Sequence, residues 1–200
     1  MKQYRVGLIG SGYIGRAHSI ALQEVGAVFP DVATPICEIL ADRDAATAEK
    51  SAAAMGFRRS TGDWRELVAD PAVDIIHICS PNYLHREMAL AAIAAGKHVW
   101  CEKPLALDTS EAREVAEAAA RAGVVHMIGF NYSCNPLIRV AQSMIAAGDV
   151  GEVRHVEASY RQSWLVGRMW GDWRTDPKWL WRLSQKHGSK GVLGDVGVHI

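Results

Sequence analysis

The sequence lacks a net charge, a long apolar run and paired cysteines, and each absence removes a class of protein. Basic and acidic side chains both number 22, so no net field draws the chain to nucleic acid or an anionic membrane. No stretch approaches the about 20 apolar residues of a membrane span, and no apolar leader with a cleavage site follows Met1. We expect a cytoplasmic protein with neither a nucleic-acid nor a membrane partner.

The cysteines and most histidines form no ligand cluster. No C-x-x-C pair is present, and no histidine cluster shows zinc-like spacing, so we expect no metal site. The cysteines are interpreted as small buried hydrophobes in a reducing cytosol. Five histidines without a partner pattern are interpreted as structural or surface residues: His77, His98, His126, His155 and His187.

Short β-rich runs alternate with helical stretches through residues 1–130. Strands are expected at Tyr4–Ile9, Ile36–Ala41, Asp74–Cys79, His98–Cys101 and Val124–Gly129, with a short extended piece at Arg58–Ser60. Helices are expected at Tyr13–Val25, Ala45–Met55, Trp64–Val68, His85–Ala95 and Ser110–Ala122. Regular alternation of this kind predicts an α/β fold with right-handed crossovers and a doubly wound parallel sheet. Residues 1–130 are therefore expected to form a Rossmann dinucleotide-binding domain.

The pattern changes after Asn131. A helix is expected at Pro136–Ala147, a turn at Gly148–Gly151 and a longer alternating strand at Val153–Tyr160, and the chain stops at Ile200 inside a helix that has just begun. One strand and an unfinished helix cannot close a second core. We therefore expect residues 131–200 to be the beginning of an incomplete α+β domain in a longer protein.

The turn after the first strand has the spacing Gly10-x-Gly12-x-x-Gly15 and opens a helix. Gly10 permits the tight turn, Gly12 lets the backbone approach a pyrophosphate, and Gly15 lets the helix pack on the strand. The N–H groups of the first helical turn, at Tyr13 and Ile14, are free to bind phosphate oxygens. The glycine spacing alone is a weak signal, but this strand–turn–helix context predicts a dinucleotide site.

Asp42 follows the second strand, where an acidic residue accepts hydrogen bonds from the adenosine ribose hydroxyls. It favours NAD. The neighbouring guanidinium of Arg43 can pair with a 2′-phosphate, so NADP stays open.

Later motifs occur in an order that resembles the glucose–fructose oxidoreductase / inositol dehydrogenase (Gfo/Idh/MocA) family. The matching pieces are Gly10–Gly15, Ser80-Pro81-Asn82 with His85, Glu102-Lys103-Pro104, Gly129-Phe130-Asn131-Tyr132, Trp181-Arg182 and Gly194–His199. The resemblance implies an NAD(P)-dependent oxidoreductase acting on a sugar, polyol or related secondary alcohol. It also implies that a second domain with an open mixed sheet continues past Ile200, and that the full-length protein is a dimer or tetramer.

The candidate catalytic residues are Lys103, Asp195 and His199. Lys103 follows a parallel strand, where its ammonium can stabilise the alkoxide that forms as hydride leaves, and the resemblance implies a cis bond before Pro104. Asp195 and His199 are spaced i, i+4 and share one face if they lie on a helix. His199 suits a general base, with Asp195 orienting it or binding a substrate hydroxyl.

The resemblance further implies cofactor contacts from Ser80, Pro81, Asn82, His85, Glu102, Lys103, Asn131, Trp181 and Arg182. Relatives often carry arginine where this chain has Ser133, so any contact made by that arginine is missing. Two alternatives stay open beside the dehydrogenase: an NAD-dependent glycosidase and a sugar-sensing, cofactor-binding regulator without turnover. The acid–base residues argue against the regulator.

Overall fold

The computed structural model describes residues 3–161, 163, 166–167, 169, 171–172, 174–176, 183–184 and 190–199. The chain forms two compact units, Met1–Ile128 (unit 1) and Gly129–Ile200 (unit 2). No helix among these described residues is long and apolar enough to cross a membrane.

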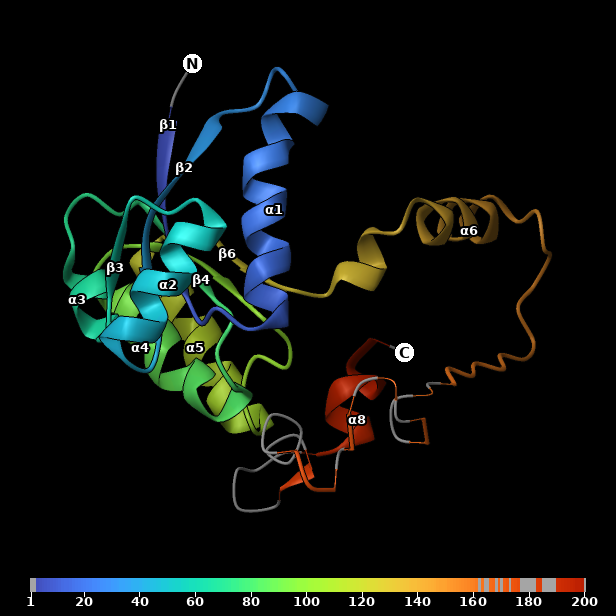
Figure 1. Ribbon diagram of the computed structural model, residues 1–200. Helices are drawn as coiled ribbons and strands as arrows, with labels where there is room; N and C mark the ends of the chain where they lie inside the picture. Colours follow the sequence, from blue (N-terminus) through green and yellow to red (C-terminus); the bar gives the residue numbers. More distant parts are fainter. Residues whose placement is uncertain are drawn as a thin grey trace. The chain divides into compact units, whose positions relative to one another are not determined.

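Unit 1 is a six-stranded parallel sheet with helices on both faces (Figure 1). Its strands are β1 (Gln3–Ile9), β2 (Thr34–Ala41), β3 (Arg59–Thr61), β4 (Ile75–Ile78), β5 (His98–Cys101) and β6 (His126–Ile128). Its helices are α1 (Tyr13–Val28), α2 (Ala45–Met55), α3 (Trp64–Ala69), α4 (His85–Ala94) and α5 (Thr109–Ala122). The strand order β3-β2-β1-β4-β5-β6 confirms the predicted doubly wound Rossmann sheet.

Side chains at the helix ends explain why the crossovers begin and end where they do. The carboxylates of Asp44, Asp63 and Asp108 cap α2, α3 and α5 by accepting backbone N–H groups from the first turn. Gly56 and Gly123 end α2 and α5 in the left-handed conformation, at φ 72° and 65°. Caps of this kind satisfy backbone groups at the helix ends and mark where each helix begins and ends.

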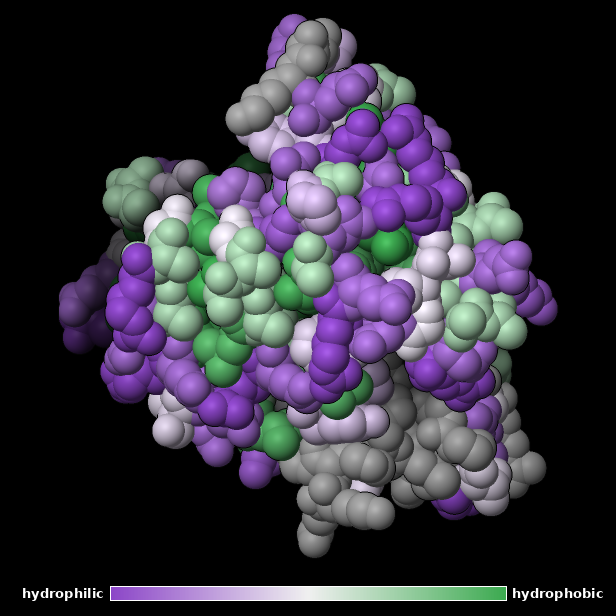
Figure 2. Space-filling view, turned by 90° about the vertical axis from the view of Figure 1, so that its left-hand side faces the viewer, coloured by the Kyte–Doolittle hydropathy of each residue, from purple (hydrophilic) through white to green (hydrophobic). Residues whose placement is uncertain are grey.

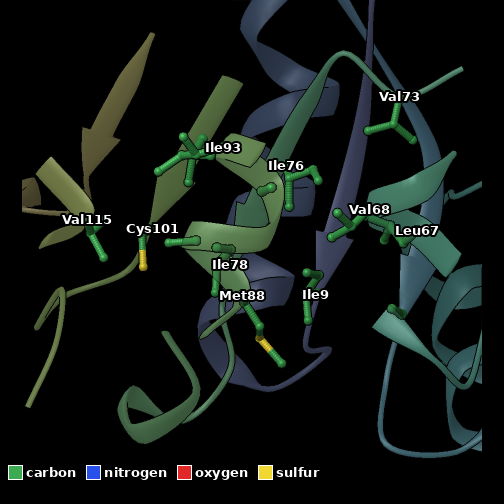
Figure 3. Packing of buried hydrophobic residues seen from close by; sticks show 14 of the residues in the cluster. Ile9, Leu67, Val68, Val73, Ile76, Ile78, Met88, Ile93, Cys101 and Val115 are labelled. Atoms are coloured by element: carbon green, nitrogen blue, oxygen red, sulfur yellow. The ribbon is translucent and has the colours of Figure 1, made fainter. Parts of the chain in front are cut away.

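The two faces of the sheet carry separate apolar cores, because alternate residues of a strand point to opposite faces. Ile9 joins the core under α3, α4 and α5, which Figure 3 shows, and the adjacent Leu8 joins the core under α1 and α2. Labelled members of the first core are Leu67, Val68, Val73, Ile76, Ile78, Met88, Ile93, Cys101 and Val115. The cysteines Cys37, Cys79 and Cys101 are buried free thiols, as expected, but Cys134 is exposed.

Unit 2 contains the helices α6 (Pro136–Ala147) and α8 (Val192–Asp195) and the 3₁₀ turns Asn131–Cys134 and Gly197–His199. The prediction of a strand at Val153–Tyr160 is wrong: this segment is exposed and forms no sheet ladder in the described structure. A strand needs a neighbour to pair its N–H and C=O groups, and the described residues of unit 2 contain no other strand.

Hydrophobic side chains also lie on the surface. On the face drawn in Figure 2 they gather in patches bordered by hydrophilic residues. In unit 2 the helix α6 exposes several of them: Leu137, Ile138, Val140, Met144 and Ile145. Apolar surface of this extent on one helix is typical of a face that another element or chain covers.

Candidate functional site

The carboxyl edge of the unit 1 sheet brings four of the predicted segments to one side. The loop Gly10–Gly15 follows β1, Asp42 follows β2, Ser80–Asn82 follows β4, and Glu102–Lys103 follows β5. The strand order reverses between β1 and β4. In doubly wound sheets, ligands bind outside the carboxyl ends of the strands at such a reversal.

Each glycine of the turn occupies a different environment. Gly10 has φ 96°, and a Cβ there would lie 2.8 Å from the Cys79 carbonyl oxygen. A Cβ at Gly15 would lie 2.1 Å from the Gly10 carbonyl oxygen, so the helix can start against the strand only without a side chain. A Cβ at Gly12 would meet nothing within 4 Å. Gly12 therefore borders open space at the start of α1.

The start of α1 suits an anion. Gly12 is the N-cap residue, no described side chain caps the helix, and its first turn carries no acidic residue. The first N–H groups of the helix are therefore available to oxygens of a ligand, and the helix dipole adds positive potential there. This cradle and the open space at Gly12 fit the diphosphate of a dinucleotide.

Asp42 is fixed beside this cradle by a side-chain network. Its Oδ2 accepts hydrogen bonds from the Ser11 backbone N (2.9 Å) and the Ser11 Oγ (2.6 Å). The Ser51 hydroxyl donates to the Ser11 Oγ at 2.9 Å, and Arg43 turns its Nε to within 3.4 Å of Asp44 Oδ2. The carboxylate of Asp42 is thus held next to the phosphate loop. Sequence reasoning missed both serines, although Ser11 lies inside the glycine turn.

The loop after β4 places Asn82 and His85 differently. Asn82 is 6% exposed, and its Oδ1 has no hydrogen-bond partner among the described residues. A buried acceptor without a partner is costly, so Asn82 fits the predicted role of binding a ligand N–H or O–H. His85 is 1% exposed, and its two ring nitrogens lie 2.8 Å from the carbonyl oxygens of Ser80 and Pro104.

His85 therefore joins the loops after β4 and β5 through both ring nitrogens, and its predicted cofactor contact stays a prediction. Burial lowers the pKa of His85, while the two carbonyl contacts and the Glu102 charge oppose that shift. The position of His85 three residues after Asn82 does not indicate that both of its ring nitrogens contact protein carbonyl oxygens.

Lys103 is half-buried directly after β5. Its backbone N–H donates to Glu102 Oε2 at 3.3 Å, and the Lys103–Pro104 bond is cis, as the resemblance implied. Glu102 itself is 8% exposed.

A buried polar cluster under α1 was not predicted. His18 Nδ1 lies 2.9 Å from His77 Nδ1, and His18 Nε2 lies 3.0 Å from Glu102 Oε1. The Trp100 ring packs against both imidazoles, with centroids 5.6 Å and 5.4 Å away. His18 shares its helix face with Gly15 and Leu22, which are three and four residues away and face the sheet. That periodicity was the available signal for His18. The interpretation of His77 as a structural residue agrees with its burial in β4.

The His77 environment makes stability pH-dependent. Burial, and then the nearby His18, lower the pKa of His77 from 6.5 to about 3. Below pH 6.5, His77 binds a proton in the unfolded chain but not in the folded chain. The free energy of unfolding therefore falls as the pH drops from 6.5 towards 3. We expect His77→Asn to reduce the slope of the unfolding free energy against pH, between pH 5 and 6, by about 1.4 kcal/mol per pH unit. Denaturant titrations at both pH values measure the slope, and equal slopes for the two proteins would contradict the assignment.

Four side chains of unit 2 interact with one another. The Tyr132 ring stacks on His199 with centroids 4.1 Å apart, and the Tyr132 and Tyr160 hydroxyls are hydrogen-bonded at 2.9 Å. The bond to Tyr160 is the main cause that raises the pKa of Tyr132, and the charge of Asp195 adds to it. Sequence reasoning missed Tyr160.

Asp195 and His199 do not share one α-helix as expected, because α8 ends at Asp195 and the 3₁₀ turn Gly197–His199 follows. Lys103 lies in unit 1 and this pair in unit 2, so a common site for the three stays a prediction. Asn131 begins the 3₁₀ turn Asn131–Cys134. Trp181 and Arg182 lie outside the described residues.

Comparison with known proteins identifies the family that two parts of the chain match. Residues 4–130 match the Gfo/Idh/MocA oxidoreductase family with an NAD-binding Rossmann fold, and residues 138–200 match the Gfo/Idh/MocA C-terminal domain. Levoglucosan dehydrogenase from Pseudarthrobacter phenanthrenivorans is 36% identical over 203 residues, covering 100% of this chain and 50% of that protein. 1,5-Anhydro-D-fructose reductase from Ensifer adhaerens is 36% identical over 201 residues, covering 98% and 54%.

A solved structure is similar over the same length. Levoglucosan dehydrogenase in complex with NADH and levoglucosan matches 100% of this chain and 52% of its own, with 35% identity and a TM-score of 0.89. The chain thus spans about half the length of these relatives.

Proposed function

The chain belongs to the Gfo/Idh/MocA family of oxidoreductases with an NAD-binding Rossmann fold, and from this premise we propose that the whole protein is a sugar or polyol dehydrogenase. It transfers a hydride between NAD and a secondary alcohol of a sugar, cyclitol or related polyol. The observation that carries the proposal is the carboxyl edge of unit 1, where a helix start that no described side chain caps, Asp42 and Lys103 follow the strands β1, β2 and β5 of one parallel sheet. The two named relatives are a dehydrogenase and a reductase of anhydrosugars, which favours the dehydrogenase over a glycosidase or a regulator.

The residues of unit 1 bind and orient the cofactor. The first N–H groups of α1 hold the diphosphate beside Gly12, and Asp42 accepts hydrogen bonds from the adenosine ribose. The Oδ1 of Asn82, which has no hydrogen-bond partner among the described residues, accepts from the ribose or nicotinamide half. NAD, when bound, supplies the hydride acceptor.

The remaining roles concern the substrate. Lys103 donates a hydrogen bond to the substrate oxygen and stabilises negative charge that develops there. His199 takes the hydroxyl proton, and the stacked ring of Tyr132 fixes the plane of its imidazole. Asp195 orients His199 or binds a neighbouring hydroxyl. For Trp181, Arg182 and Asn131 we keep the predicted cofactor contacts as part of the proposal.

We further propose that residues 1–130 form the dinucleotide-binding domain and residues 131–200 begin a domain for substrate binding and oligomerisation. The exposed apolar side chains of α6 support a homo-oligomer. A cytoplasmic location agrees with three buried free cysteines.

Replacing Asp42 with alanine tests the cofactor preference. Hydrogen bonds to a charged group contribute about 1.5–3 kcal/mol, so we expect NAD+ affinity to fall tenfold or more, while loss of the charge raises NADP+ affinity. Calorimetric titration of both nucleotides measures the change, and the exposed Asp31→Ala is the control. An unchanged NAD+ affinity in Asp42→Ala would show that the ribose binds elsewhere.

The activity itself is tested by screening the whole protein across sugars and inositols with NAD+ and NADP+ in parallel. Levoglucosan, the compound in one relative's name, belongs in this oxidation panel, and 1,5-anhydro-D-fructose, named with a reductase, is tested in the reverse direction with NADH and NADPH. NADH formation with at least one secondary alcohol is the expected result. Nucleotide binding without turnover of any alcohol would reject the proposal.

A further inference from the structure

We propose that His18 is a positioning residue for Lys103: oriented by His77, it holds the Glu102 carboxylate, and Glu102 holds the backbone of Lys103. The inference rests on the proposed role of Lys103. It joins α1, whose first turn forms the phosphate cradle, to the loop that carries the candidate catalytic lysine.

The burial of Glu102 makes a partner necessary. Its side chain is 10% exposed and that of His18 is 11% exposed. Taking a carboxylate out of water is costly unless it is paired and hydrogen-bonded. One oxygen of Glu102 faces His18 Nε2 at 3.0 Å, and the other accepts the Lys103 backbone N–H at 3.3 Å. The two oxygens therefore bridge α1 and the Lys103 backbone.

The chemistry of the three groups determines which atom donates and which accepts in each contact. A carboxylate only accepts, so His18 Nε2 carries a hydrogen whichever charge state the ring takes. Burial keeps His77 neutral, with a pKa of about 3. When His18 is neutral, its Nδ1 accepts from His77 Nδ1–H across the 2.9 Å contact. A His77 that donates from Nδ1 is thereby compatible with the tautomer of His18 that can hold Glu102.

Packing keeps the imidazoles in this arrangement. His18 and His77 meet edge to face at 5.0 Å, and Trp100 contacts both rings. The indole Nε1 of Trp100 is buried without a hydrogen-bond partner among the described residues. Trp100 therefore acts as a packing surface that limits rotation of the two rings.

Two amide variants test the roles of the two ring nitrogens of His18 separately. The side chain of His18→Asn reaches the Nδ1 position, so it keeps the His77 contact and loses the donor to Glu102. The side chain of His18→Gln reaches the Nε2 position and keeps that donor. His126→Asn, an exposed histidine on β6 of the same sheet, is the matched control.

The first readout needs no cofactor or substrate. The folded proteins are treated with acetic anhydride, and acetylation of Lys103 is measured by mass spectrometry relative to the exposed Lys50. We expect His18→Asn to raise the Lys103 rate about fivefold, within the range of couplings between protein sites. His18→Gln and His126→Asn should resemble the wild type. A Lys103 rate in His18→Asn equal to that of the wild type overturns the proposal.

The second readout is kinetic and uses the whole protein. His18→Asn should lower kcat, by up to about 100-fold for a displacement near 1 Å, with the KM for NAD+ unchanged and recovery in His18→Gln. Equal loss in both variants would indicate a structural role and overturn the proposal. If the acetylation pattern holds but the wild type oxidises no alcohol, the proposed function fails while the positioning of Lys103 stands.

Discussion

Replacing Lys103 with alanine is expected to lower kcat by about 10²–10³-fold, the usual effect of removing one oxyanion donor, while NAD+ affinity changes little. The cofactor is held mainly by the α1 cradle and Asp42, which the substitution leaves intact. The ammonium, by contrast, acts on charge that develops on the substrate oxygen only as hydride leaves. Such an interaction contributes to kcat rather than to substrate binding.

Steady-state kinetics of the whole protein, with calorimetric NAD+ titration, separate these effects. Lys50→Ala, on the exposed face of α2, is the control for loss of a lysine charge. A kcat of Lys103→Ala within a fewfold of the wild type would show that Lys103 does not stabilise the transition state.

Alanine substitutions at Gly12 and Gly15 are expected to have different effects: the first weakens NAD+ binding and the second lowers stability. Gly12→Ala should leave the melting temperature unchanged, since a Cβ there meets nothing within 4 Å. It should weaken NAD+ binding about tenfold, or 1.4 kcal/mol, because the methyl group occupies space needed by the diphosphate. Gly15→Ala should destabilise unit 1 by about 3 kcal/mol, the upper end of ordinary overpacking, because its Cβ would lie 2.1 Å from the Gly10 carbonyl oxygen.

Thermal denaturation and NAD+ titration of both variants test this contrast. The exposed Gly26, whose Cβ also meets nothing within 4 Å, serves as the control position because it lies far along α1 from the cradle. If Gly12→Ala bound NAD+ as tightly as Gly26→Ala, the diphosphate would not lie against Gly12.

Unit 1 was predictable because its signals are local. Mostly apolar strands such as Ile75–Ile78 and the glycine turn each depend on a few neighbouring residues, and the parallel topology follows from the alternation of strands and helices. The placement of Asp42 and Lys103 at strand ends follows from the same pattern.

What sequence reasoning missed depends on contacts between distant residues. His18 and Glu102 meet only because the folded sheet brings the His18 side chain of α1 to side chains of β4 and β5, and no spacing along the chain encodes that pair. His85 uses both ring nitrogens inside the protein, which one sequence position cannot reveal. The Val153–Tyr160 segment shows the opposite error, since an alternating pattern describes a strand only when a partner strand is present.

The most direct test of the account follows NADH and sugar together after mixing the whole protein with NAD+ and an anhydrosugar or polyol. The account predicts that NADH accumulates in step with the oxidised sugar, and that Lys103→Ala slows both signals by about 10²–10³-fold. A glycoside hydrolysed without net NADH, or a sugar bound with neither product formed, would contradict it.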